Sequence, residues 1–278
     1  MTIYGKWDFR NKPGGFVFDE ISGKRPAYIW YAKQTSKGAL LNEGNGTNSY
    51  ISLHHPDWND VKPYEIIKPN KPYSIQITYE PTILKDTPSW IFSTPNINSN
   101  GMNGVYIEIQ GTNLYYSEIG YRIGIRELVE IPNAVEINKP NILTLYDPGV
   151  AGEEIILKNN NLKIKQIRKT NLTYVGPTNN AGNQSADISL GFKNFGALPF
   201  HGYIADFMIS DEKPKFDQSL IVYENIAYSF NSEGMIIECG PVDSITSETF
   251  DTYGFSIQDM PMGKWNKDKF SIITKKEG

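Results

Sequence analysis

Two segments of the chain place aromatic rings among carboxylate, carboxamide and hydroxyl side chains, a mixture of residue types that can bind sugars. Aromatic faces stack on the apolar faces of sugar rings, while carboxylates and carboxamides hydrogen-bond the hydroxyl groups. The segments are 54–60, His-His-Pro-Asp-Trp-Asn-Asp, and 111–121, Gly-Thr-Asn-Leu-Tyr-Tyr-Ser-Glu-Ile-Gly-Tyr. The candidate ligand-binding residues are Asp57, Trp58, Asn59, Tyr115, Tyr116 and Tyr121. The alternative is that each ring packs beneath its own loop or against a neighbouring subunit.

Residue patterns for catalysis are scarce. The sequence contains no Gly-x-Ser-x-Gly nucleophile turn and no phosphate-binding loop ending in Gly-Lys-Ser or Gly-Lys-Thr. The adjacent histidines His54 and His55 would point to opposite sides of a strand, which disfavours chelation of a metal by both. Cys239 has no neighbouring base, so we expect a small buried residue there. We therefore predict no catalytic residues.

The composition argues against several classes of protein. The chain has 278 residues, a formal net charge of −4 and one cysteine, so an intrachain disulfide is impossible. A slightly acidic balance argues against a nucleic-acid partner held by a general basic field. No apolar run approaches the roughly 20 residues of a membrane span, and the first residues do not resemble a secretory signal. We expect no nucleic-acid binding, no membrane insertion and no signal peptide.

Short strands separated by Gly-, Asn- and Pro-rich turns recur along the first 212 residues. In 72–79 the residues alternate with period two: Tyr73, Ile75, Ile77 and Tyr79 share one face of the predicted strand. Residues 104–109 alternate in the same way. Such a series of short strands predicts an all-β fold, an antiparallel β-sandwich of the jelly-roll type.

The positions of three tryptophans and of the basic residues follow from these strands. Trp7, Trp30 and Trp90 fall on strand segments, and we expect them in the core. A basic cluster follows Glu154, on a predicted hairpin whose edge strand the charges would protect from pairing. Its members are Lys158, Lys163, Lys165, Arg168 and Lys169.

The C-terminal part has a different pattern. Apolar residues spaced three or four apart predict a helix over 216–230, although Ile221-Val222-Tyr223 is also compatible with a strand. Short strands are expected after it, to residue 278. We predict a sandwich domain over 1–212 and a docking or assembly extension over 213–278.

Several motifs together resemble a known family. They include Tyr4-Gly-Lys-Trp-Asp-Phe, Val17-Phe-Asp-Glu-Ile-Ser-Gly-Lys, Gly46-Thr-Asn-Ser-Tyr-Ile-Ser-Leu and Pro199-Phe-His-Gly-Tyr-Ile-Ala-Asp-Phe-Met-Ile-Ser. In order and spacing they are similar to laminin-G-like, concanavalin A-like domains, over roughly residues 1–212. One departure is Asn160-Asn161 where the family usually has Asn-Gly, and another is Ala205 before Asp206 where many members have a second Asp.

The resemblance implies two kinds of site. Relatives can bind Ca²⁺ through an Asp on the closing strand, so Ca²⁺ is a possible cofactor. The residues at the corresponding positions are Asp206, Asp8, Gly44 and Gly46. Alternatively, Asp206 accepts hydrogen bonds from a loop or pairs with a lysine. Some relatives are β-glucanases with Glu-x-Asp-x-x-Glu on one strand, but the only glutamates here that are five apart are Glu233 and Glu238, with Met235 at the Asp position.

The resemblance also suggests a context. Laminin-G-like domains are common in phage tail, baseplate and head-fibre proteins that face bacterial surface glycans. We therefore expect a non-enzymatic virion or surface protein that contacts other virion subunits and cell-surface carbohydrate during host attachment. Copies of the same chain are among its expected partners. The alternatives are a purely structural or decoration subunit that binds no sugar, and a glycoside hydrolase of the same fold.

Overall fold

The computed structural model describes most of the chain, and all structural statements below refer to these residues. They are 3–12, 14–43, 49–53, 66–94, 96–98, 101–120, 124–160, 162–173, 188–191, 198–211, 213, 218–230, 236–246, 249–250, 253, 255–256 and 271–275. The chain divides into two compact units, Met1–Lys213 and Pro214–Gly278, which we call the sandwich unit and the C-terminal unit. This boundary lies one residue from the predicted one.

Eight strands form the first sheet of the sandwich unit. They are β1 (Ile3–Asp8), β4 (Lys33–Thr35), β5 (Gly38–Leu41), β7 (Tyr73–Pro81), β13 (Asn141–Asp147), β14 (Glu154–Asn159), β15 (Leu162–Ile167) and β18 (Gly202–Ser210). Their order across the sheet is β15-β14-β13-β7-β18-β5-β4, and β1 also pairs with β18. Neighbours in this sheet are antiparallel.

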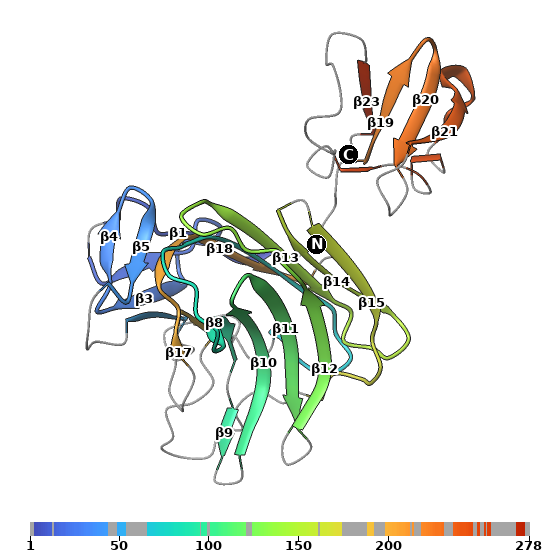
Figure 1. The fold of residues 1–278 in the computed structure, drawn as a ribbon. Helices are drawn as coiled ribbons and strands as arrows, with labels where there is room; N and C mark the ends of the chain where they lie inside the picture. The colour runs from blue at the N-terminus through green and yellow to red at the C-terminus, as the bar shows by residue number, and fades with distance from the viewer. Residues whose placement is uncertain are drawn as a thin grey trace. The chain divides into compact units, whose positions relative to one another are not determined.

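Ten strands form the second sheet. They are β2 (Phe16–Phe18), β3 (Pro26–Trp30), β6 (Tyr50–Leu53), β8 (Ser89–Ser93), β9 (Asn96–Asn98), β10 (Gly101–Gln110), β11 (Asn113–Gly120), β12 (Gly124–Ile131), β16 (Ile188–Leu190) and β17 (Leu198–Pro199). The order is β12-β11-β10-β8-β16-β6-β3-β2, with β9 on β10 and a short parallel pairing of β17 with β8. The long strands β10, β11 and β12 lie side by side in Figure 1.

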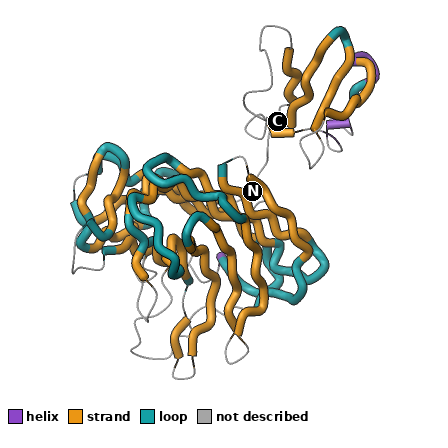
Figure 2. Tube along the Cα trace, in the orientation of Figure 1, coloured by secondary structure: helices purple, strands orange, loops and turns teal. Residues whose placement is uncertain are grey.

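The core lies between the two sheets, as the alternation predicts. Tyr73, Ile75, Ile77 and Tyr79 of β7 are all buried, as are the apolar residues of β10 at 105, 107 and 109. A row of stacked rings joins the two sheets. The ring centroids of Trp7 (β1) and Phe207 (β18), both in the first sheet, lie 5.7 Å apart, and the centroid of Phe207 lies 6.0 Å from that of Phe92 (β8) in the second sheet. The fold is therefore an all-β, antiparallel β-sandwich, and strands dominate it in Figure 2.

The C-terminal unit contains a sheet of its own. Its elements are β19 (Gln218–Tyr223), β20 (Ile226–Phe230), β21 (Ile236–Pro241), β22 (Phe255–Ser256), β23 (Ser271–Lys275) and the short 3₁₀ helix η2 (Val242–Ser244). The strand order is β21-β20-β19-β22, with β23 also on β19. Within the described part of both units, no helix is long and apolar enough to cross a membrane.

The predicted helix over 216–230 is wrong, because residues 218–230 form the β19–β20 hairpin. Tyr223 pairs with Ile226 across a two-residue turn, Glu224-Asn225, in which both residues have positive φ, 48° and 66°. Two positive φ values match the twist of a tight β-hairpin turn. The strand-forming run Leu220-Ile-Val-Tyr therefore outweighs the apolar spacing that suggested a helix.

Candidate functional site

Five exposed or half-buried aromatic side chains form a continuous set on the outer surface of the second sheet, near its β2 edge. They come from β2, β3 and β6, and the residues that alternate with them point into the core. Phe16, Phe18 and Trp30 are 49%, 48% and 42% exposed. We call the set the aromatic face. Its members are Phe16, Phe18, Tyr28, Trp30 and Tyr50.

Each ring of the aromatic face contacts the next. The centroids of Phe18 and Phe16 lie 5.4 Å apart, and those of Phe16 and Tyr28 lie 6.2 Å apart. The ring centroids of Tyr28 and Trp30 lie 6.3 Å apart. The Trp30 ring stacks on that of Tyr50, with 6.2 Å between the centroids and 22° between the ring planes. Pairing of Phe16 with Tyr28, and of Trp30 with Tyr50, sets this arrangement through the strand register. Three paired strands thus present a preformed aromatic surface.

The buried side chain of Asp19 holds the hairpin that carries four of these rings. Its carboxylate accepts hydrogen bonds from the backbone N–H groups of Ser22, Lys24 and Arg25, at 2.7, 3.2 and 2.8 Å, and from the Ser22 hydroxyl at 2.9 Å. Burial by itself raises the pKa of Asp19, but these hydrogen bonds outweigh it and lower the pKa below its ordinary value. The ionised carboxylate is therefore part of the β2–β3 turn.

Replacing Asp19 by alanine is expected to destabilise the sandwich unit by about 2–3 kcal/mol at pH 7, because several charge-assisted hydrogen bonds are lost. A lowered folded-state pKa adds stability above the ordinary carboxyl pKa, near 4. That stability disappears as the pH falls through the folded-state value. Urea unfolding between pH 3 and 7 measures both effects. Asp19→Asn keeps one acceptor oxygen, which can still accept the three hydrogen bonds made to Asp19 Oδ1, but its NH₂ group would face the Ser22 N–H. It should therefore lose the acid dependence and part of the stability, and equal pH profiles for wild type and Asp19→Asn would contradict this role.

Of the three tryptophans predicted in the core, Trp7 and Trp90 are buried, but Trp30 is not. The prediction for Trp30 is wrong because Ala27 and Ile29 point into the core, and period two then turns Tyr28 and Trp30 outward. The alternation of residues along the strand predicts that Tyr28 and Trp30 share one face. Because Ala27 and Ile29 on the other face are apolar too, the sequence does not show which of the two faces is exposed.

Two tyrosines of the predicted ligand site, Tyr115 and Tyr116, lie on opposite faces of the second sheet. Tyr115 faces outward on β11, and its hydroxyl donates a 2.9 Å hydrogen bond to Glu130 Oε1. The next residue, Tyr116, points inward and is completely buried. Its prediction as a surface ligand contact is wrong, because consecutive strand residues face opposite sides. The other predicted ligand residues, Asp57, Trp58, Asn59 and Tyr121, lie outside the described residues.

Tyr116 instead belongs to a buried polar cluster that joins the sheets. Its hydroxyl donates to Asp147, which also accepts a 2.6 Å hydrogen bond from Arg168 Nη1. Arg168 Nη2 pairs with Glu118, whose other oxygen accepts from the backbone N–H and hydroxyl of Thr173. Arg168 was expected among the surface charges of the edge strand. That expectation is wrong, because its guanidinium is completely buried between two carboxylates.

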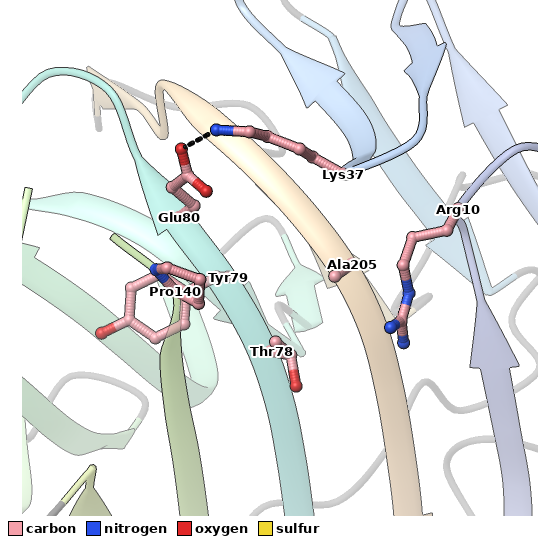
Figure 3. Close-up of a pocket in the computed structure, with 7 residues that line it drawn as sticks. All are labelled: Arg10, Lys37, Thr78, Tyr79, Glu80, Pro140 and Ala205. Atoms are coloured by element: carbon pink, nitrogen blue, oxygen red, sulfur yellow. Dashed lines mark hydrogen bonds and ion pairs between the residues drawn. The ribbon is translucent and has the colours of Figure 1, made fainter. Parts of the chain in front are cut away.

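A charged depression lies on the outer surface of the first sheet (Figure 3). Its volume is about 220 Å³, and its walls come from Arg10, Lys37, Thr78, Tyr79, Glu80, Pro140 and Ala205. The Lys37 ammonium donates to Glu80 Oε1 at 2.6 Å and lies 5.2 Å from the ring centre of Tyr203. The Glu80 carboxylate, which lines the depression, is thus already paired with a cation.

The same region holds the predicted calcium ligands Asp8 and Asp206. They are paired across β1 and β18, but the Arg10 guanidinium bridges them, donating to Asp8 Oδ1 at 2.9 Å and to Asp206 Oδ2 at 2.7 Å. Gly44 and Gly46 lie outside the described residues. Among the residues placed in the structure, no group of three His, Cys, Asp or Glu side chains could hold a metal. Calcium at this position stays a prediction, and its binding would require Arg10 to release both carboxylates.

Comparisons with known proteins agree with the architecture. No family model and no curated protein sequence matches the chain. A sialidase from Trypanosoma rangeli in complex with sialic acid matches with a TM-score of 0.52 at 10% identity, over 76% of this chain and 31% of the sialidase. A structure described as a receptor binding domain matches with a TM-score of 0.51 at 13% identity, over 84% of this chain and 60% of that one. The chain thus spans about a third of the sialidase's length, and these likenesses show a shared β-sandwich fold alone.

Proposed function

We propose that the sandwich unit is a non-enzymatic, lectin-like module that contacts carbohydrate through its aromatic face. The observation that carries this proposal is the continuous contact of five aromatic rings on an outer sheet surface, with Phe16, Phe18 and Trp30 each more than 40% exposed. Sugar rings have apolar faces that stack on such rings, and the Tyr hydroxyls and the Trp indole N–H can also hydrogen-bond hydroxyl groups. Aromatic residues of this kind are the usual anchors of a binding surface.

The rigidity of the surface supports binding to an extended ligand. The rings project from hydrogen-bonded strands rather than from a loop, so little conformational entropy is lost when a ligand binds. The bound sialic acid of the matched sialidase and the receptor binding of the second match are properties of those proteins. They support carbohydrate as the class of ligand to test first.

The absence of catalysis is part of the proposal. The carboxylates in and beside the depression of the first sheet, Glu80, Asp8 and Asp206, are each paired with Lys37 or Arg10. A glycoside hydrolase needs one carboxyl as proton donor and a second as base or nucleophile. In each of these three residues a carboxylate oxygen already accepts a hydrogen bond from Lys37 or Arg10, and this contact would compete with one to a glycosidic oxygen.

Binding of the purified chain to a panel of immobilised bacterial surface glycans tests the proposal. Each site is expected to bind weakly, so the protein is presented both as a monomer and as a multimer that supplies avidity. Specific retention of the multimer, without cleavage of the glycan, is the expected result. Failure of the multimer to bind any glycan would contradict the proposal and favour the alternative, in which the aromatic face is covered by a neighbouring subunit of an assembly.

We further propose that the chain acts in a multi-copy particle, such as a phage virion, with the C-terminal unit as the docking part. The division of the chain into two compact units supports separate roles. A variant ending at Lys213 is expected to remain folded and to unfold cooperatively, but to lose self-association or assembly. Circular dichroism and sedimentation compare it with the full chain. An unfolded truncated variant would show that the units depend on each other.

A further inference from the structure

A β-bulge shapes the charged depression on the first sheet. The pairing of β18 with β7 shifts between Ile204 and Asp206, so that Ala205 is an extra residue without a partner on β7. A bulge bends its strand and redirects the side chains beside it. Because Ala205 carries only a methyl group, it leaves open the space beside Thr78 of β7 (Figure 3). A larger side chain at the bulge would fill this space.

Two oxygen atoms at the depression have no hydrogen-bond partner among the described residues. One is the Thr78 hydroxyl, and the other is Glu80 Oε2, because Lys37 donates only to Oε1. Neither oxygen is among the atoms that the described structure buries without a partner, and both residues line the depression, so a ligand can reach them. Glu80 is nevertheless only 8% exposed as a residue. The surrounding sheet therefore holds its carboxylate in place.

The walls of the depression supply N–H donors that are only partly used. Arg10 donates from Nε to Asp8 and from Nη2 to Asp206, and its Nη1 donates to none of the described groups. The Lys37 ammonium has three N–H groups, one of which donates to Glu80. Both cationic side chains are about half exposed. The depression thus offers hydrogen-bond donors and acceptors together.

This combination of groups suits a neutral sugar. A sugar hydroxyl donates one hydrogen bond and accepts others, so it can use both kinds of partner. Three carboxylates accompany the two cations, so an anionic ligand would meet no net positive charge. The exposed ring of Pro140 adds an apolar wall. The volume of about 220 Å³ lies below the roughly 300–1,000 Å³ typical of drug-sized ligands, which fits one sugar unit better than an oligosaccharide.

We infer that the depression of the first sheet is a second carbohydrate site, which binds a single neutral sugar unit. The sugar hydroxyls donate to Glu80 Oε2 and to the Thr78 hydroxyl, and they accept from Arg10 and Lys37. The aromatic face lies on the other sheet, so this inference goes beyond the proposed function and does not depend on it. Two sites on one chain would allow it to hold two branches of a glycan at once, which increases avidity.

Titration of the full chain with glucose, galactose, mannose and N-acetylglucosamine, followed by ¹H–¹⁵N NMR, tests this inference. At least one of these sugars should shift the backbone amide signals of Thr78 and Ala205 in a saturable way. Thr78→Val keeps the branched shape and should weaken binding of that sugar about fivefold, because one hydrogen bond is lost. Ala205→Leu fills the depression and should abolish binding. The matched control is Thr144→Val, at a half-buried threonine on the outer face of β13 that does not line the depression, and it should leave the affinity unchanged.

The outcomes separate this inference from the proposed function. If none of the four sugars shifts the Thr78 and Ala205 signals, the inference is overturned, while retention on the glycan panel that depends on Trp30 leaves the proposed function standing. If retention survives in Trp30→Ala but is lost in Thr78→Val, the proposal for the aromatic face fails and this inference stands. Equal weakening by Thr78→Val and Thr144→Val, or tighter binding of glucuronate than of glucose, would also overturn the inference.

Discussion

Replacing Arg168 by alanine is expected to lower the free energy of unfolding of the sandwich unit by about 3–5 kcal/mol. The guanidinium is completely buried, and it neutralises two equally buried carboxylates, Asp147 and Glu118. Removing it leaves the buried Asp147 without its cation and Glu118 with only the 3.9 Å ion pair to Arg126, and it also removes a contact to the Tyr116 hydroxyl. Breaking a buried ion pair from one side costs more than the pair contributes when intact, because the remaining charge stays desolvated.

Urea unfolding followed by tryptophan fluorescence measures this loss. Arg168→Met retains most of the side-chain volume and should be destabilised to a similar extent, which separates the loss of charge from the creation of a cavity. The control is Lys165→Ala, because its ion pair with Glu154 is half exposed and should contribute less than about 1 kcal/mol. A variant at Arg168 as stable as Lys165→Ala would show that the cluster does not hold the sheets together.

Trp30→Ala is expected to weaken glycan binding by at least about tenfold, since a stacking tryptophan at the centre of a contact surface commonly contributes about 2 kcal/mol or more. Trp30 contacts both Tyr28 and Tyr50, so its removal separates Tyr50 from the other three rings of the aromatic face. The side chain is 42% exposed, so stability should change much less than binding.

The matched control for Trp30 is Ile125→Ala on β12, at the opposite edge of the same sheet. Ile125 is a large apolar residue that is 61% exposed and lies outside the aromatic face. Its removal should leave retention on the glycan panel unchanged. Equal losses in the two variants would indicate nonspecific adhesion of exposed apolar residues rather than binding at the aromatic face.

The buried face of a strand could be predicted best where polar and apolar residues alternate along it. In β7, the polar residues between Tyr73 and Tyr79 marked which side faces the core, and the structure confirms it. The Asn160-Asn161 pair, which stands where the family usually has Asn-Gly, was also compatible with a hairpin: Asn160 adopts φ 51° between β14 and β15. Asparagine tolerates this left-handed conformation better than most residues.

The candidate site was harder to predict for two physical reasons. In β3, Ala27 and Ile29 alternate with Tyr28 and Trp30, so both faces are apolar and the exposed one cannot be recognised from the pattern alone. The burial of Arg168 depends on partners 21 and 50 residues away in the sequence. Such contacts depend on how the sheets pack, and a basic residue beside an edge strand gives no local sign of them.

The most direct test of carbohydrate binding at the aromatic face is ¹⁹F NMR of protein labelled with 5-fluorotryptophan, titrated with an oligosaccharide retained on the panel. The chain provides five tryptophan reporters, and the Trp30 resonance is assigned by its loss in Trp30→Phe. We predict that the Trp30 resonance shifts with saturation, while that of Trp7, buried in the core, stays in place. Saturable binding that leaves the Trp30 resonance unmoved would contradict the account, because the sugar would then be bound elsewhere.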